Sequence, residues 1–136
     1  MLQHDYQSDL EKVLFILSLS HVHETWTIKD IQRVIIPPLK LNQYRIYIDE
    51  EVPLCYASWA MFPEEAEEGY KNKTRKIQPE DWNSGDNLWL IDVICPFGGT
   101  RTAMKRLGTL MNELGLPKKV NFKRWGRSGV SNVKRI

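Results

Sequence analysis

The sequence is poor in cysteine and lacks any long apolar run. Only two cysteines, Cys55 and Cys95, occur in 136 residues, and both lie in apolar stretches typical of strands. Two cysteines make no disulfide framework, so we expect two buried free thiols and a reducing compartment, the cytoplasm. No window of about 18 apolar residues is present, which predicts that no segment spans a membrane.

The start of the chain lacks the features of a secretory signal. The first six residues, Met1 to Tyr6, show no basic segment followed by an apolar one. This agrees with the expectation of a cytoplasmic protein. A chain of 136 residues can bury one hydrophobic core, and we expect a single domain over residues 1–136.

Acidic side chains are almost missing from the last third of the chain. Residues 101–136 contain ten Lys or Arg and one acid, Glu113, so this segment carries +9 and residues 1–100 carry −7. A basic third of a small domain indicates an anionic partner, either nucleic acid, a phosphate-bearing cofactor or an acidic protein. The alternative is a merely solvated surface. The last residues, 126–136, are expected to form a mobile basic tail.

The order of apolar and polar residues predicts a small mixed sheet flanked by helices. A capping-box pattern at Ser8 and a second start signal at Thr27 indicate two helices, the second ending at Pro37-Pro38. Strand patterns follow at 44–48 and 52–61, then a short acidic helix after Pro63 and a polar loop over 71–86. The expected inward residues of the three longer helices are Leu10, Val13, Leu14 and Leu17, then Ile28, Ile31 and Ile35, then Ala103, Leu107, Leu110, Met111 and Leu114. The fold class is therefore α/β or α+β.

Asp92 is the most informative residue. It lies inside the otherwise apolar run 88–95, which is bounded by Ser84-Gly85-Asp86 and by Pro96-Phe97-Gly98-Gly99 and therefore predicts a buried strand. An ionised carboxylate in such a strand is unfavourable unless another group pairs with it. The sequence thus requires a partner for Asp92.

Histidine is also scarce, so the candidates for that partner are few. His4 lies near the start of the chain, and His21 and His23 lie in the loop expected between the first two helices. A buried carboxylate can fix the tautomer of an imidazole and favour its protonated form, while the second ring nitrogen stays available to take a proton. A satisfied core histidine is the alternative. Two histidines without a third ligand cluster give no metal site.

A glycine pair connects the Asp92 strand to the third long helix. Gly98, Gly99, Thr100 and Arg101 lie at the expected helix start, where backbone N–H groups can face an anion such as the phosphate of a pantetheine arm. A tight strand-to-helix turn that needs glycine explains the pair equally well.

Several motifs together resemble those of the toxin-activating lysine acyltransferases of RTX toxins. The family pattern D-W-x-S-G-D-x-x-W-x-I-D-x-x-A-P-F-G is matched by residues 81–98, where Cys95 replaces the alanine. Residues 56–60 match Y-x-S-W-A, and residues 42–44 match N-Q-Y. The family's S-x-x-H-x-x-W falls on Ser20, His23 and Trp26, which selects His23 over His21.

The resemblance implies a fold, an activity and partners. Family members have a fold similar to the GNAT acetyltransferases, act in the cytoplasm and tend to form homodimers. They move a fatty acyl group from acyl–acyl carrier protein to internal lysine side chains of an RTX protoxin. The family's catalytic residues fall on His23 and Asp92, and its motif serine falls on Ser20. No cofactor is tightly bound, because the acyl carrier protein and its phosphopantetheine thioester act as co-substrate.

The physical demands of this reaction agree with those residues. A lysine amine has a pKa of about 10.4, so a base is needed beside the attacking nitrogen at neutral pH. His23 oriented by Asp92 can serve, with assistance typically worth about 10²–10⁴ in rate. Arg101, Lys105 and Arg106 are the candidate docking residues for the acidic carrier protein, and Gly98 to Arg101 the candidate seat of its phosphopantetheine.

The sequence departs from the family in places and leaves two alternatives open. Arg33-Val34-Ile35-Ile36-Pro37 stands where many members have an asparagine before V-L-P, and the last third matches weakly. One alternative is a GNAT-like transferase that uses acyl-CoA. The other is a non-enzymatic basic module over 101–136, with Phe122 and Trp125 among basic residues, that binds nucleic acid. The absence of a nucleic-acid motif counts against it.

Overall fold

The sheet that organises the protein has five strands in sequence order. The computed structural model describes residues 6–123 and, for the backbone alone, residues 131–135. The strands are β1 (Tyr44–Asp49), β2 (Val52–Phe62), β3 (Asn87–Ile94), β4 (Lys119–Lys123) and β5 (Ser131–Arg135). All neighbours are antiparallel except β3 and β4, which are parallel and are joined by helix α5 (Thr100–Glu113). The expected mixed sheet is therefore confirmed.

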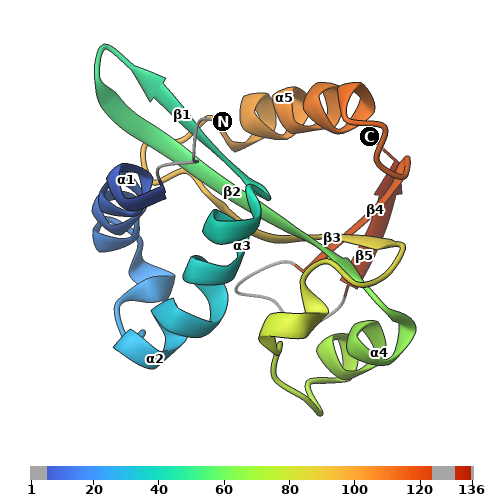
Figure 1. Ribbon diagram of the computed structural model, residues 1–136. Coiled ribbons are helices and arrows are strands. Elements are labelled where there is room, and N and C mark those ends of the chain that lie inside the picture. Colours follow the sequence, from blue (N-terminus) through green and yellow to red (C-terminus); the bar gives the residue numbers. More distant parts are fainter. Residues whose placement is uncertain (1–5, 124–130, 136) are drawn as a thin grey trace, which may run out of the picture.

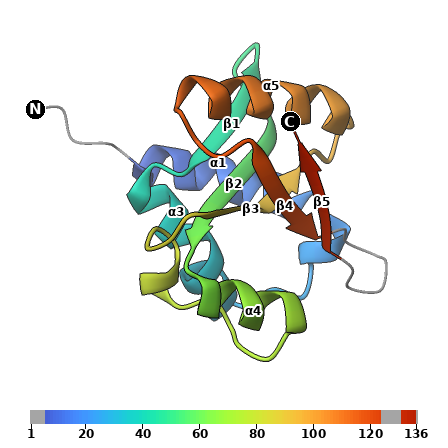
Figure 2. The ribbon, with the colours of Figure 1, turned by 90° about the vertical axis from the view of Figure 1, so that its right-hand side faces the viewer.

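Helices cover both faces of this sheet (Figure 1). The remaining elements are α1 (Tyr6–Ser18), η1 (His21–His23), α2 (Ile28–Asp30), η2 (Ile31–Ile35), α3 (Ile36–Leu41), α4 (Glu64–Asn72) and η3 (Pro79–Asp81). Helix α5 packs alone on one face, whereas α1 to α3 and α4 lie on the opposite face (Figure 2). Because side chains of a strand alternate between faces, each residue of β2 and β3 belongs to one of these two layers.

Three apolar clusters form the core. On the α5 face, Ala57 and Leu90 pack against Leu107 and Met111. The opposite face carries two clusters. One gathers side chains of α1 and α3 on Tyr56 and Ile94, and the other gathers α4 and Trp82 on Ala60 and Trp89. The gap between these two clusters is where Ser58 and Asp92 lie opposite each other.

The polar loop before β3 is held by tight packing. Trp82 is fully buried, and the backbone N–H groups of Ser84 and Gly85 both donate to the carbonyl of Met61. A Cβ at Gly85 would lie 2.1 Å from the carbonyl oxygen of Phe62, so only glycine fits there. The tryptophan and glycine of this motif thus serve the fold, and they fix where β3 begins.

The second helix differs from the expectation. It does not end at Pro37-Pro38 but continues as α3 to Leu41. The prolines cannot donate the usual backbone hydrogen bonds, and the preceding turn widens into the π-helical η2, in which the N–H of Ile36 donates to Ile31. Ile28, expected to be buried, is 87% exposed because α2 is a single short turn at the surface.

Two further helix positions were predicted wrongly, and part of the expected tail is a strand. Leu14 and Leu114 are exposed, and Ile16 takes a core position on α1 instead. A helix has 3.6 residues per turn, so a small rotation of its axis exchanges neighbouring positions at the edge of the apolar face. Of the expected mobile tail 126–136, residues 131–135 form β5 against β4, since β4 offers an edge to pair with. Residues 126–130 and 136 lie outside the described residues.

Candidate active site

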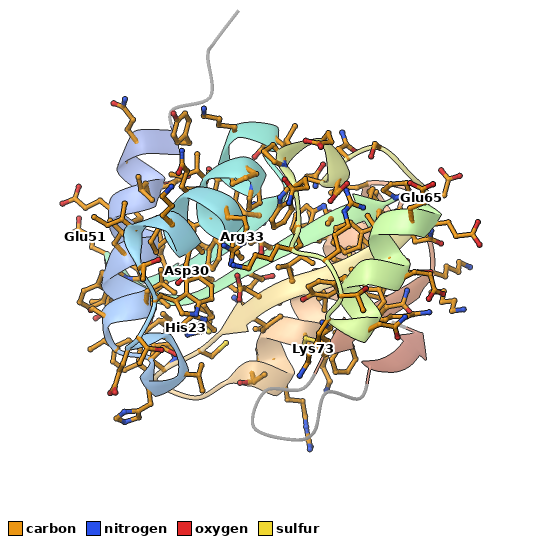
Figure 3. The ribbon with its side chains drawn as sticks, turned by 90° about the horizontal axis from the view of Figure 1, so that it is seen from below. His23, Asp30, Arg33, Glu51, Glu65 and Lys73 are labelled. Carbon is orange, nitrogen blue, oxygen red and sulfur yellow. The ribbon has the colours of Figure 1, made fainter. Side chains whose placement is uncertain are left out.

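His23 is buried although it lies between two helices. The segment expected to be an open loop forms the single turn η1, whose first backbone bond joins the His23 N–H to the Ser20 carbonyl at 3.2 Å. The ring of Trp26 packs edge-on against the imidazole, with centroids 4.5 Å apart. His23 keeps only 6% of its surface exposed. Figure 3 shows it on the inner side of the helices, near β3.

Asp92 is the charged group that faces His23. It is 1% exposed, and its Oδ1 lies 3.7 Å from His23 Nε2. This distance allows an ion pair but exceeds hydrogen-bond length. A β-bulge interrupts the pairing of β2 and β3 directly beside Ser58 and Asp92, and bulges of this kind re-aim side chains next to active sites. The structure therefore places side by side the two residues that the sequence paired, while their catalytic role stays a prediction.

Ser20 completes a line of three side chains. Its Oγ lies 2.6 Å from His23 Nδ1, so a short hydrogen bond joins them. Ser20 is half-buried and thus lies nearer to solvent than His23 and Asp92. Nε2 faces the carboxylate and Nδ1 faces the Ser20 hydroxyl, and the expectation that the second ring nitrogen takes a proton stays a prediction. The order from surface to interior is Ser20, His23, Asp92.

This arrangement can move a proton. An imidazole that gains a proton inside a protein is stabilised by a carboxylate at a few ångströms, since little water screens the pair. The hydroxyl at Nδ1 connects the ring to the surface. Hydroxyl, imidazole and carboxylate in line are the parts from which proteins build general bases and activated nucleophiles.

Tyr56 and Ser58 belong to the Y-x-S-W-A motif in the sequence, and the structure places both near Asp92. Ser58 lies directly opposite Asp92 across β2 and β3, and Tyr56 lies two residues along the same face. Both are fully buried. Burial, and then the negative charge of Asp92, raises the pKa of Tyr56 well above its ordinary value. Polar residues at alternate positions of an otherwise apolar strand were the signal that could have identified them.

A tyrosine from α4 borders the same region. Tyr70 packs edge-on against Trp89, with ring centroids 5.3 Å apart. Burial and next the charge of Asp92 raise the pKa of Tyr70. The amine of Lys123 lies over the Tyr70 ring and donates to the Tyr70 carbonyl. Burial lowers the pKa of Lys123, helped by the charge of Lys73.

The expected donor-binding turn lies on the other face. Gly98 and Gly99 adopt φ values of 92° and 87° at the start of α5 and line a cavity of about 570 Å³. Arg106 also lines it and stacks over Tyr47, 5.5 Å from the ring centroid. Thr100, Arg101 and Lys105 are exposed and do not line this cavity. Asp92 points to the opposite layer, so the structure does not bring the turn and the His23–Asp92 pair onto one face.

The cysteines and the remaining histidines lie outside the His23–Asp92 pair. Cys55 and Cys95 are free thiols, as expected, and burial together with Cys95 raises the pKa of Cys55 to about 12. His21 is exposed, and its Nδ1 lies 2.9 Å from Glu24 Oε1. His4 lies outside the described residues. Within residues 6–123, no three His, Cys, Asp or Glu side chains gather as metal ligands. None of the described helices is long and apolar enough to cross a membrane.

Comparison with solved structures shows the class of fold. The crystal structure of the loading GNATL domain of CurA from Lyngbya majuscula superposes with a TM-score of 0.62 at 12% identity. The match covers 92% of this chain and 64% of that domain's chain. The protein therefore has a GNAT-like fold, as the sequence motifs implied.

Comparison with known sequences shows the family. The signature of the RTX toxin acyltransferase family matches residues 3–133. The chain is 32% identical to the RTX-II toxin-activating lysine-acyltransferase ApxIIC of Actinobacillus pleuropneumoniae over 79% of its length, and 34% identical to the leukotoxin-activating lysine-acyltransferase LktC of a Pasteurella haemolytica-like strain over 81%. It is 31% identical to the protein-lysine myristoyltransferase RtxC of Kingella kingae over 80%. The chain belongs to the RTX toxin acyltransferase family. The matched segments span 66%, 66% and 65% of these three relatives.

Proposed function

We propose that this protein transfers a fatty acyl group from acyl–acyl carrier protein to internal lysine side chains of an RTX protoxin. The observation that carries the proposal is the line from the half-buried Ser20 to the buried His23 and Asp92, with 2.6 Å and 3.7 Å between successive partners. Family membership supports it, because relatives are toxin-activating lysine acyltransferases by name. The reaction also needs what this line offers, a base for an amine.

His23 acts as the general base, and Nδ1 is the nitrogen that receives the proton. A lysine side chain has a pKa of about 10.4, so it arrives protonated at neutral pH and has to lose a proton before or during attack. Nε2 faces Asp92, whose charge stabilises the imidazolium that forms. Ser20 Oγ covers Nδ1 from the surface side, so the lysine amine approaches from the side of Ser20. The Ser20 hydroxyl therefore lies on the path of the proton to Nδ1.

Bond changes follow the usual course of acyl transfer. The lysine ammonium first releases one proton to solvent. The neutral amine nitrogen then attacks the thioester carbonyl, passes a second proton to His23, and the carbon–sulfur bond breaks. The phosphopantetheine thiolate takes that proton from His23 and leaves as a thiol, while the acyl group remains on lysine as an amide. The thioester is already electrophilic, so the base and correct positioning of the two substrates are the main demands on the protein.

The acyl donor binds along the end of β3. Only Asn121 and Phe122 of the described β4 residues pair with β3, opposite Trp89 and Leu90. The edge of β3 from Ile91 to Ile94 is not paired with any of these residues. An extended phosphopantetheine arm can add to such an edge by backbone hydrogen bonds. Along this edge the arm leads from the Gly98-Gly99 turn and the cavity on the α5 face to Asp92 on the opposite face.

The carrier protein docks on the exposed basic residues of α5. Arg101, Lys105 and Arg106 are exposed on this helix and suit an acidic partner. Homodimer formation and a cytoplasmic location remain predictions from the resemblance. Sedimentation of the purified protein checks the first, and cell fractionation the second.

Mass spectrometry of the protoxin tests the proposal. The purified protein is incubated with a protoxin and either myristoyl–acyl carrier protein or myristoyl-CoA. We expect one acyl mass on lysine, a faster reaction with the carrier-protein donor, and no reaction with His23→Ala. His21→Ala, two residues away and exposed, serves as the matched control and should react normally. Faster transfer from CoA would favour an acyl-CoA transferase, and no transfer from either donor would refute the proposal.

A further inference from the structure

Three buried polar atoms surround the inner end of the Ser20–His23–Asp92 line. Asp92 Oδ2, Ser58 Oγ and Tyr56 Oη are all inaccessible to solvent, and Asp92 Oδ2 has no hydrogen-bond partner among the described residues. The hydroxyls of Ser58 and Tyr56 make no hydrogen bond of normal geometry there, but the Ser58 hydroxyl lies close enough to Tyr56 to act on its pKa. The three residues share one sheet face, because Ser58 pairs with Asp92, and Tyr56 is two residues from Ser58 on the same strand. They form a small polar centre, which we call the Asp92 centre.

The position of the Asp92 centre makes its polarity unexpected. It separates the apolar cluster on Tyr56 and Ile94 from the apolar cluster on Ala60 and Trp89. An apolar pair at the Ser58–Asp92 register position would join the two clusters. Unpartnered buried polar groups are rare in native proteins, and each needs an explanation. Their place at the inner end of the Ser20–His23–Asp92 line points to a role in the reaction.

We propose that Tyr56 and Ser58 are positioning residues of the same active site, whose hydroxyls donate hydrogen bonds to the Asp92 carboxylate during the reaction. This inference rests on the proposed function. An ionised carboxylate accepts hydrogen bonds only, and a hydroxyl can rotate to donate one. Two such donors satisfy the carboxylate without water and keep Oδ1 directed at His23 Nε2. The 3.7 Å separation of these two atoms leaves room to shorten when the imidazolium forms.

The charged and titratable groups around the centre support this assignment. From η1 it is faced by His23, from α4 by Tyr70, and from β1 by Tyr44. Burial and the charge of Asp92 raise the pKa of Tyr56 and of Tyr70, so both phenols keep their protons and remain donors at neutral pH. The Tyr44 hydroxyl donates to Asp9 at 2.5 Å.

The nearby cations have partners of their own. The guanidinium of Arg33 lies 3.1 Å from Asp30, and Figure 3 shows both side chains on the helices rather than at β3. The amine of Lys123 lies over the ring of Tyr70. The described residues thus surround Asp92 with His23, Ser58 and the phenols of Tyr56 and Tyr70.

Two substitutions remove one hydroxyl each. Tyr56→Phe keeps the ring, and Ser58→Ala removes one oxygen atom. In each we expect kcat to fall about tenfold while KM for the acyl donor stays unchanged, the usual size for a hydrogen bond to a charged group. The acid limb of the pH–rate profile should move to higher pH by up to about one unit. The reason is that a less stabilised Asp92 carboxylate lets the His23–Asp92 pair bind a proton at a higher pH. A purely structural role would lower stability and leave the acid limb in place.

Tyr44→Phe is the matched control. It also removes a buried phenol hydroxyl from the same cluster, but that hydroxyl binds Asp9. We expect lower thermal stability and an unchanged acid limb. If Tyr56→Phe does not fold, Ser58→Ala decides alone. Wild-type kcat and a wild-type acid limb in folded Ser58→Ala or Tyr56→Phe would overturn the inference.

A second measurement separates this inference from the proposed function. The chain has three histidines, so the ring signals of His23 can be assigned in an NMR titration by comparison with His23→Ala. We expect the His23 titration curve to move to higher pH in Ser58→Ala and not in Tyr44→Phe, with no substrate present. If no donor supports acyl transfer but this movement occurs, the proposed function fails while the link between the hydroxyls and the pair stands. An unmoved curve would overturn the inference.

Discussion

Replacing Asp92 with asparagine removes one charge and almost no volume from the candidate active site. At 3.7 Å, a carboxylate and an imidazolium attract each other by about 4 kcal/mol if the effective dielectric constant of a buried protein site is taken as about 20. That energy is present only when His23 carries the transferred proton, so it acts on the transition state rather than on substrate binding. Its complete loss equals about 10³ in rate.

We expect Asp92→Asn to lower kcat about 10²–10³-fold and to leave KM for the acyl donor nearly unchanged. The asparagine oxygen can still face His23, which keeps the loss below the complete electrostatic effect. Stability should not fall, because Asp92 Oδ2 has no hydrogen-bond partner within the described residues and removing a buried charge is favourable. The rate is measured as acyl-lysine formed on the protoxin by mass spectrometry, and stability by urea unfolding.

Asp81→Asn provides a matched control with the opposite result. Asp81 is also buried, but it binds Arg75 at 2.8 Å and the backbone N–H of Gln78 at 2.8 Å, outside the site. This variant should lose about 1–3 kcal/mol of stability and keep the wild-type rate per folded molecule. Asp92→Asn with a kcat within threefold of the wild type would refute the proposed action of the carboxylate.

The remaining predictions concern other parts of the protein. Ser20→Ala should lower kcat about tenfold, because one hydrogen bond at Nδ1 is lost, and the NMR signals of the His23 ring should show that the ring stays in place. An unchanged kcat would show that Ser20 is not on the proton path. Cys55→Ser should stay active, because a thiol with a pKa of about 12 is protonated at neutral pH; an inactive but folded variant would revive a thiol nucleophile. Burial, and next the charge of Asp92, raises the pKa of Tyr70, so the folded state keeps a proton that the unfolded chain loses at high pH. The free energy of unfolding should therefore be level below about pH 10 and fall above it. Urea unfolding measured at rising pH would contradict this if it showed no fall. Arg106→Glu should raise KM for the carrier-protein donor more than Lys29→Glu on α2, most clearly at low salt; equal effects would argue against docking on α5.

Much of the fold follows from local patterns in the sequence. β1 alternates apolar and polar residues before an acidic turn, β2 is an apolar run after it, and α5 repeats apolar residues at helical spacing after a glycine pair. Such patterns express which side of an element is buried, so they predict the element itself. The wrong predictions lie where an element meets another, as at Pro37-Pro38, where a widened π turn lets the helix continue.

The candidate active site was predictable only in part. Asp92 was identified because a charge inside an apolar strand demands a partner, and His23 because it matches a motif. The burial of His23 was not predictable, since it depends on the turn η1 and on Trp26 packing against the ring. The contact of Ser20 with Nδ1 likewise depends on the rotation of one turn of backbone.

By itself, the sequence determined the type and order of most helices and strands, the family, and the two residues most suited to acid–base chemistry. These follow from local periodicity and from the energetic demand of a buried charge, which are properties of neighbouring residues. Only the tertiary structure decided which atoms meet. It set Nε2 toward Asp92 and Nδ1 toward Ser20, put Tyr56 and Ser58 beside the carboxylate, and separated the glycine turn onto the other face. Such contacts join residues distant in sequence, and their geometry depends on register and packing that no local pattern encodes.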